Sequence, residues 1–241
     1  MKINNDFYEE LKDEWFTSNC HPIALLRAEN RLRAPWIASQ LKTPSDVLDI
    51  GCGAGFLSNH LAAQGHRVQG IDLSASSLEV ARAHDLTHTA TYTQADAMAL
   101  PFPDGHFDIV CAMDILEHVE NPARLIEEGS RVLKKNGLFF FHTFNRNFWS
   151  WLVVIKGVDW CVPHAPPRMH VYPLFLRPAE LIAMGAEHHL ILSDLRGVAP
   201  CVASKAFLRM LVKRRIEDDF AFRFTKSLKT GYCGYFRKKR N

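Results

Sequence analysis

Three glycines behind an acidic residue form the stretch of the sequence best suited to bind a ligand. The stretch Asp49–Gly55 reads D-I-G-C-G-A-G, and it directly follows the apolar residues Val47 and Leu48. Gly51 and Gly53 can adopt the positive φ of a tight turn, and without a side chain they let a ligand approach the backbone closely. We therefore predict that this loop joins a buried strand to a helix and holds a nucleotide-like ligand.

Two kinds of nucleotide-like ligand fit a glycine loop of this sort. A dinucleotide site has the spacing G-x-G-x-x-G, but here Phe56 stands where the third glycine would be. Asp49 precedes the first glycine by two residues, and its carboxylate would repel a pyrophosphate. The same carboxylate suits S-adenosylmethionine, which carries a sulfonium, an ammonium and a ribose but no phosphate. The loop therefore favours S-adenosylmethionine as the cofactor.

Two more carboxylates follow predicted strands and could hold the rest of that cofactor. Asp72 lies about 20 residues beyond Gly51, where an acid can accept hydrogen bonds from both ribose hydroxyls. Asp96 follows the next strand and could accept the adenine amino hydrogens, a role compatible with capping a turn. Residues beside these strand ends are predicted to line the same site: Leu73, Ala97 and Met113.

Three polar residues that could act on an acceptor molecule follow the predicted strand 107–112. Asp114, Glu117 and His118 share one face of a helical turn because of their spacing. Two carboxylates and an imidazole can bind a divalent cation such as Mg²⁺, and the cation would acidify a catechol. Two alternatives stay open. His118 could act as a general base without a metal, or Glu117 and His118 could merely cap the next helix.

An aromatic segment follows the predicted fifth strand. Residues 148–163 contain Trp149, Trp151 and Trp160, with a short apolar run between them. Tryptophans that border an apolar stretch are typical of an amphipathic segment at a membrane surface. The alternative is a lid packed on the core over the acceptor site. Both arrangements imply an acceptor with a large apolar part.

An alternation of strands and helices must position these residues. Seven strands are predicted near residues 46–50, 67–71, 90–95, 107–112, 137–143, 188–195 and 231–237. Helices are predicted near residues 55–64, 75–83, 121–134, 178–184 and 206–216. This order predicts an α/β, Rossmann-like, doubly wound fold with a mostly parallel seven-stranded sheet. The carboxyl ends of its parallel strands would meet at one edge and bring the candidate residues together.

We predict that all 241 residues form one domain with four parts. Residues 1–42 form an N-terminal cap of two amphipathic helices, and residues 43–143 form the cofactor-binding core. Residues 144–177 form the acceptor lid or membrane segment. Residues 178–241 complete the sheet around a helical insertion.

The composition excludes several classes of protein. The chain is 47% hydrophobic and 23% charged, as globular proteins are, and its net charge of +3 gives no reason to expect nucleic acid as a partner. Its six cysteines include no C-x-x-C pair, so a thiolate metal site is not expected. Reduced, scattered cysteines predict a cytoplasmic protein. The sequence shows neither a signal peptide nor a run of about 18 apolar residues that could span a membrane.

The glycine loop resembles motif I of the class I methyltransferases, D-x-G-x-G-x-G, at every fixed position, and Asp96 resembles their acidic motif. Further stretches resemble the ubiquinone-biosynthesis O-methyltransferase family over roughly residues 15–190. These stretches are His21–Arg33, Asp114–Val119, Thr143–Asn147 with Ser150 and Trp151, and Arg177–Leu181. Asp114 departs from the glutamate usual in that family, and residues 197–230 follow the family pattern poorly.

The resemblance implies a methyl transfer from S-adenosylmethionine to a hydroxyl of a polyprenyl phenol or catechol. It implies that Arg33 reaches toward the cofactor and that Asp114, Glu117 and His118 bind a divalent metal. It also implies that the segment after strand five contacts a membrane surface, on the inner face. The partners that it implies are a lipophilic phenol or quinol substrate and a biosynthetic complex.

On this basis the sequence predicts an S-adenosylmethionine-dependent O-methyltransferase of ubiquinone biosynthesis. In the predicted reaction a phenolate attacks the sulfonium methyl in line, and the enzyme contributes mainly by placing the two together. Two other functions stay open. One is a class I methyltransferase for a carboxylate or carbon acceptor, and the other is a non-catalytic cofactor-binding assembly subunit.

Overall fold

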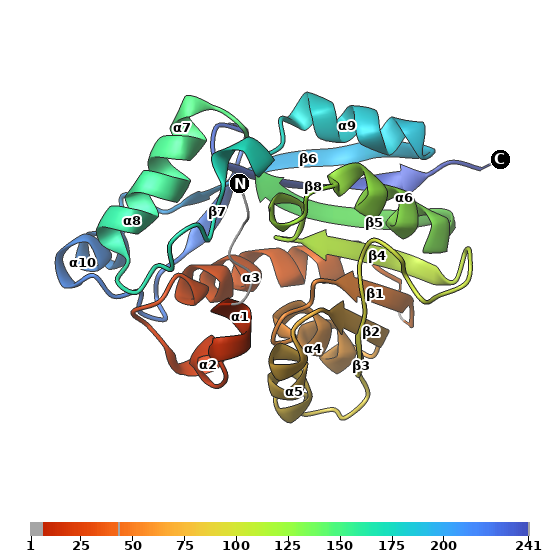
Figure 1. The fold of residues 1–241 in the computed structure, drawn as a ribbon, viewed down its shortest axis with the longest axis horizontal. Helices are drawn as coiled ribbons and strands as arrows, with labels where there is room; N and C mark the ends of the chain where they lie inside the picture. The colour runs from red at the N-terminus through yellow and green to blue at the C-terminus, as the bar shows by residue number, and fades with distance from the viewer. Residues whose placement is uncertain (1–6, 43, 241) are drawn as a thin grey trace.

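An eight-stranded sheet forms the centre of the molecule (Figure 1). The computed structural model describes residues 7–42 and 44–240. The strands are β1 (Asp46–Ile50), β2 (Arg67–Asp72), β3 (Thr91–Gln94), β4 (Phe107–Met113), β5 (Leu133–Phe144), β6 (Leu190–Pro200), β7 (Phe222–Thr225) and β8 (Gly231–Lys238). Their order in the sheet is β3-β2-β1-β4-β5-β8-β6-β7.

The sheet has a parallel half and an antiparallel half. Strands β3, β2, β1, β4 and β5 pair in parallel, whereas β5–β8, β8–β6 and β6–β7 pair antiparallel. The predicted Rossmann-like, doubly wound fold is therefore confirmed. The sheet has one strand more than predicted, because the short edge strand β7 pairs with the end of β6.

Helices cover both faces of the sheet (Figure 1). Alternate residues of β4 show the two layers. Val110 and Ala112 pack beneath α6 (Pro122–Val132) and α9 (Pro178–Glu187), whereas Ile109 and Cys111 pack beneath α3 (Ile23–Ala38) and α4 (Phe56–Ala63). Both sets are fully or almost fully buried, which is why β4 reads as a continuous apolar run. The covering helices are α3 (Ile23–Ala38), α4 (Phe56–Ala63), α5 (Ala75–Ala83), α6 (Pro122–Val132) and α9 (Pro178–Glu187).

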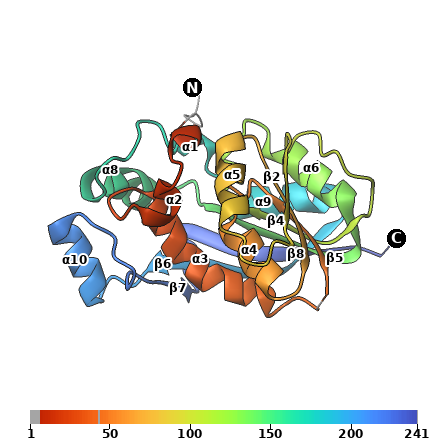
Figure 2. The same ribbon diagram turned by 90° about the horizontal axis from the view of Figure 1, so that it is seen from below.

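The N-terminal cap contains three helices where two were predicted. The short helices α1 (Phe7–Glu10) and α2 (Glu14–Thr17) precede α3, and residues 1–6 of the predicted cap lie outside the described residues. Leu11 and Trp15 are buried against Ala54 of the glycine loop. The view from below places α1 beside the start of α5 (Figure 2). The cap therefore lies over the carboxyl end of the parallel strands.

The segment after β5 forms a helical arm made of α7 (Phe148–Ser150), a π-helical stretch η2 (Trp151–Gly157) and α8 (Val158–Cys161). It packs against α10 (Lys205–Lys213), which shares a buried apolar cluster with Val158 and Val162. Figures 1 and 2 both place α8 and α10 at one end of the molecule. No helix in the described ranges combines the length and the apolar character that crossing a membrane requires.

Candidate active site

One large cavity opens where β1, β2 and β4 end. Its volume is about 700 Å³, and it is lined by residues of the glycine loop, the N-terminal cap, the helical arm and α10. Of the residues predicted from the sequence, all except Asp96 line this cavity: Arg33, Asp49, Gly51, Gly53, Asp72, Leu73, Ala97, Met113, Asp114, Glu117 and His118. The parallel sheet thus gathers residues that are far apart in the sequence at one opening.

The glycine loop has the backbone that its sequence predicts. Gly51, Gly53 and Gly55 have φ angles of 69°, 50° and 78°, in the left-handed region that favours glycine. A Cβ at Gly51 would lie 2.5 Å from Ile115, so a side chain there would also clash. Asp49 is buried behind the loop, where it accepts a hydrogen bond of 2.6 Å from Ser58 Oγ. Burial raises the pKa of Asp49 to about 7.

Asp72 holds the glycine loop in place at the end of β2. One carboxylate oxygen accepts a hydrogen bond of 2.8 Å from the amide of Gly53, and the other accepts one of 2.9 Å from Ser74. Burial raises the pKa of Asp72. The residue lines the cavity, and its predicted contact with the ribose hydroxyls stays a prediction.

Asp96 lies beside the cavity instead of in its lining. Its side chain is exposed and accepts a hydrogen bond of 2.8 Å from the amide of Met98, so it caps the turn that follows β3. Its neighbours Ala95 and Ala97 do line the cavity. The structure therefore shows the capping role that the sequence left open, and the predicted adenine contact stays a proposal.

Arg33 and Asp114 form a buried ion pair in the cavity wall. The two terminal nitrogens of Arg33 donate to the two carboxylate oxygens of Asp114, at 2.8 and 2.5 Å. Asp114 also lies against His142 Nδ1, while Glu29 lies 3.2 Å from Arg33. Burial opposes the charge of Asp114, but Arg33 and His142 together hold its pKa well below the usual range. Both oxygens of this carboxylate are thus already engaged.

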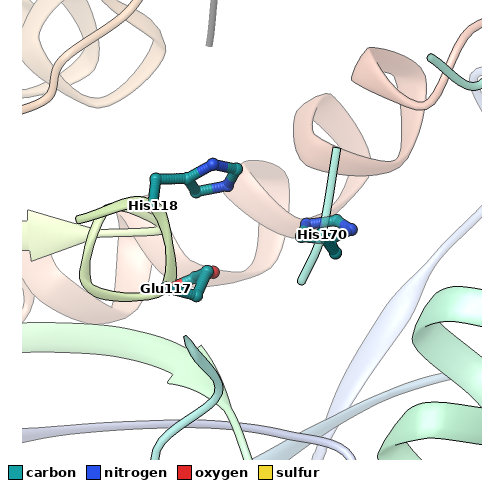
Figure 3. Close-up of side chains that lie close together, drawn as sticks. All are labelled: Glu117, His118 and His170. Carbon is teal, nitrogen blue, oxygen red and sulfur yellow. The ribbon is translucent and has the colours of Figure 1, made fainter. Parts of the chain in front are cut away.

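The structure brings Glu117 and His118 together with His170, which the sequence analysis did not single out (Figure 3). Glu117 and His118 lie on the turn η1 (Leu116–His118) after β4, and His170 lies just before the turn η3 (Tyr172–Leu174). Their ligand atoms all lie within 4.8 Å of one another. Asp114 belongs to a second group, with Glu29 and His142. Both oxygens of Asp114 accept hydrogen bonds from Arg33, and the predicted metal set Asp114, Glu117 and His118 stays a prediction.

Burial shifts the pKa of each residue in the group Glu117, His118 and His170. Burial and the nearby Asp114 raise the pKa of Glu117 to about 8. Burial lowers the pKa of His118 to about 4 and that of His170 to about 3. Both imidazoles are therefore neutral near pH 7, as metal ligands and general bases must be.

The far part of the cavity is apolar. It is lined by residues of α3, the helical arm and α10. Figure 1 shows α8 and α10 at the end of the molecule away from α6. The side chains that line it include Leu25, Val154, Val158, Val162, Phe207 and Met210. An acceptor with a long apolar tail would find its tail buried there and its polar head near Glu117 and His118.

Comparison with known proteins agrees with this geometry. Residues 48–141 match the model of a methyltransferase domain. The chain is 36% identical over 205 residues to a protein of Paraburkholderia xenovorans named ubiquinone biosynthesis O-methyltransferase, a match that covers 83% of this chain and 88% of the relative. A protein of the same name from Thiobacillus denitrificans is 36% identical over 196 residues, with 79% and 84% coverage.

Solved structures agree on the fold. A crystal structure of an SAM-dependent methyltransferase from Methanosarcina mazei superposes with a TM-score of 0.60 at 21% sequence identity, and the match covers 86% of this chain and 98% of that one. The methyltransferase-domain match includes the glycine loop, β2 and β4, which are the elements that form the cofactor end of the cavity. The chain therefore belongs to the class I S-adenosylmethionine-dependent methyltransferases and is a relative of the ubiquinone biosynthesis O-methyltransferases.

Proposed function

We propose that this enzyme transfers a methyl group from S-adenosylmethionine to a hydroxyl of a polyprenyl phenol or catechol in ubiquinone biosynthesis. One observation carries the proposal: a single cavity joins the glycine loop to an apolar compartment, with Glu117 and His118 between them. The names of the relatives support the same acceptor. We further propose that the whole chain acts as one methyltransferase unit.

The chain's own residues would position the reactants and remove a proton. Bound S-adenosylmethionine supplies an electrophilic methyl group. The glycine loop and Asp72 would hold its amino acid and ribose parts, and the apolar compartment would hold the acceptor tail and exclude water. In the alternative without a metal, His118, which lines the cavity and is neutral near pH 7, would accept the phenolic proton on its ring.

We also propose that a divalent ion binds at the same place, where it would lower the pKa of a bound catechol. The structure supports an ion at Glu117, because this carboxylate is fully buried and neither of its oxygens has a hydrogen-bond partner among the described residues. In this proposal Glu117 and His118 hold the ion. Asp114 holds Arg33 in the cavity wall, as its two hydrogen bonds to that residue indicate.

We also propose that the helical arm contacts a membrane surface, where a biosynthetic complex would pass on the acceptor. Its outer face exposes Phe148, Trp149 and Trp160, while Leu152, Val153 and Val154 line the cavity. Helix α10 adds two exposed apolar residues that do not line the cavity, namely Leu208 and Val212. The arm could therefore act as a lid on its inner side and as a membrane contact on its outer side.

The test compares acceptors in solution. A catechol with a short prenyl chain should give kcat/KM at least roughly tenfold higher than the same catechol without it, because each buried CH₂ contributes about 0.8 kcal/mol. Met210→Gln should reduce that ratio, whereas Leu208→Gln on the exposed side of the same helix should preserve it. Preference for a carboxylate or carbon acceptor would replace the proposal with the other methyltransferase class. Cofactor binding without turnover on any acceptor would favour the non-catalytic subunit.

A further inference from the structure

Glu117, His118 and His170 meet although they come from two distant segments. The first two lie on η1 directly after β4, and the third belongs to the loop between α8 and η3. Their possible ligand atoms all lie within 4.8 Å of one another, and the rings of His118 and His170 have centroids 5.5 Å apart. Figure 3 shows the three side chains around a common space.

The carboxylate in this group lacks the partners that a buried acid needs. Glu117 is 0% exposed, and neither oxygen accepts a hydrogen bond within the described part of the chain. Burying a carboxylate without compensation is costly, so such groups in native proteins are paired or bind a metal. A divalent ion between Glu117 and the two imidazoles would satisfy both oxygens.

The donor set identifies the class of ion. Two imidazoles and one carboxylate suit Zn²⁺, Fe²⁺ and Co²⁺, whereas Mg²⁺ prefers oxygen ligands in an octahedron. Asp114 would have supplied a second carboxylate, but Arg33 engages both of its oxygens. The remaining ligands therefore favour a transition-metal ion.

We infer that His170 is the third ligand of a transition-metal ion bound by Glu117 and His118, and that this ion ties the loop before η3 to the acceptor cleft. The inference rests on the proposed function for the presence of a metal, and it adds the third ligand, the ion and the fastening of the loop. Met169 and His170 both line the cavity, so an ion here would fix one wall of the acceptor site. Open coordination positions would remain for a catechol.

The first test is a titration of the full chain with Co²⁺, whose visible absorption reports bound imidazoles. The wild-type chain should bind one ion with a Kd that excess Mg²⁺ does not change. His170→Phe keeps a ring against Phe144 and Phe175 and should weaken Co²⁺ binding by more than roughly 100-fold. His164→Asn, in the same loop but exposed, should bind Co²⁺ as the wild type does. Asp114→Asn should also retain binding, with circular dichroism confirming that each variant is folded.

The second test is tryptic cleavage after the exposed Arg168. Co²⁺ should slow this cleavage at least several-fold in the wild type and leave it unchanged in His170→Phe. Wild-type Co²⁺ affinity in His170→Phe, or loss of binding in folded Asp114→Asn, would overturn the inference. No Co²⁺ binding by the wild type would overturn it too.

Co²⁺ binding and methyl transfer, measured separately, distinguish the metal site from the proposed function. Methylation of a catechol by a chain that binds no Co²⁺ would remove the metal site and keep the function. Tight Co²⁺ binding without methylation of any catechol would keep the site and remove the proposed acceptor.

Discussion

Two aspartates at the edge of the cavity, buried Asp49 and partly buried Asp114, show how neighbouring groups determine the charge of a carboxyl group. Asp49 has the carboxylates of Asp72 and Asp114 near it, and burial is the main cause that raises its pKa to about 7. Asp114 has Arg33 at both oxygens, and its pKa falls well below the usual range. Asp49 can therefore gain or lose a proton near neutral pH, whereas Asp114 stays ionised.

Asp49 should make the cofactor-free protein less stable as the pH rises. Its folded-state pKa of about 7 lies above the ordinary value of 3.8, so the folded state binds more protons between these two values. The free energy of unfolding should fall across this window, by on the order of 3 kcal/mol. Asp49→Asn can keep the hydrogen bond from Ser58 and should remove most of that fall. Urea denaturation from pH 4 to 8 measures it.

Asp46 provides a control of opposite sign. Arg67 and Lys134 lower its pKa to about 2, so its contribution to stability is present above pH 3.8 and is lost as the pH falls through about 2. Asp46→Asn should therefore leave the slope between pH 4 and 8 unchanged. An identical slope in wild type and Asp49→Asn would show that Asp49 does not titrate in this range.

Asp72→Ala should weaken S-adenosylmethionine binding by about 1–3 kcal/mol, because the ribose hydroxyls lose a charged acceptor. The substitution also removes the hydrogen bond that holds the amide of Gly53. Calorimetry measures the affinity, and Asp104→Ala, which removes an exposed carboxylate that pairs with Arg131, is the control. Equal affinity in Asp72→Ala and the wild type would remove Asp72 from the cofactor site.

At this scale, sequence reasoning located the cofactor end of the cavity better than the acceptor end. Local motifs place Asp49, Gly51 and Asp72 at strand ends, because apolar residues predict the strands to which they belong. His170 has no such marker, since it lies in an irregular loop and meets Glu117 only through folding. The partner of Asp114 was missed for the same reason, because Arg33 belongs to a helix that precedes the sheet.

Hydrogen bonds to the start of α5 hold helix α1 over the glycine-loop end of the cavity. The carboxylate of Glu9 accepts hydrogen bonds from the amides of Ala75 and Ser76, at 3.1 and 3.4 Å. Ser76 Oγ also donates to the carbonyl of Glu9, at 2.9 Å. Tyr8 and Glu9 line the cavity. We therefore expect α1 to move when the cofactor enters or leaves.

Glu9→Ala should speed cofactor release. Loss of two amide contacts at a helix N-terminus costs about 1 kcal/mol, which corresponds to a roughly fivefold higher koff. Stopped-flow displacement of bound S-adenosylmethionine measures this rate. Glu10→Ala is the matched control, because Glu10 is exposed on the same helix. Equal release rates in the two variants would show that this contact does not limit release.

The helical arm should bind anionic vesicles reversibly. Trp149 and Trp160 are 50% and 64% exposed, and burying a large apolar side chain contributes roughly 1.5–3 kcal/mol. Nearby lysines add about 1 kcal/mol each at an anionic surface, so binding should weaken with salt. Flotation should show Trp149→Ser with Trp160→Ser largely unbound, and Leu86→Ser, at an exposed apolar site on another surface, bound like the wild type. Equal flotation of all three chains would leave the arm as a lid only.

Most elements follow from apolar periodicity, and the exceptions have local causes. β4 is buried on both faces and is apolar from Ile109 to Met113, whereas β1 and β2 carry shorter apolar stretches. β7 is an edge strand of four residues with an exposed arginine, so its pattern is too short to separate it from a loop. β7 pairs with β6, which is distant in sequence, so a local pattern does not predict the pairing. The helical periodicity of the preceding α10 also favoured a helical interpretation of this part of the chain.

For the whole molecule, the fold supplies a cavity with two unlike ends. The parallel half of the sheet supplies the polar cofactor end, and the helical arm with α10 supplies the apolar end. Both ends open onto the turn that carries Glu117 and His118. This shared opening is the central structural reason to propose methyl transfer onto a lipophilic acceptor.

The most direct measurement follows an isotopically labelled methyl group from S-adenosylmethionine into a short-chain prenyl catechol. Mass spectrometry and NMR would locate the label in the product. The same incubation without enzyme gives the background. If the proposed function is right, we expect one labelled methyl ether on a catechol oxygen. Label on a ring carbon or on a carboxylate, or no transfer by a chain that binds the cofactor, would contradict it.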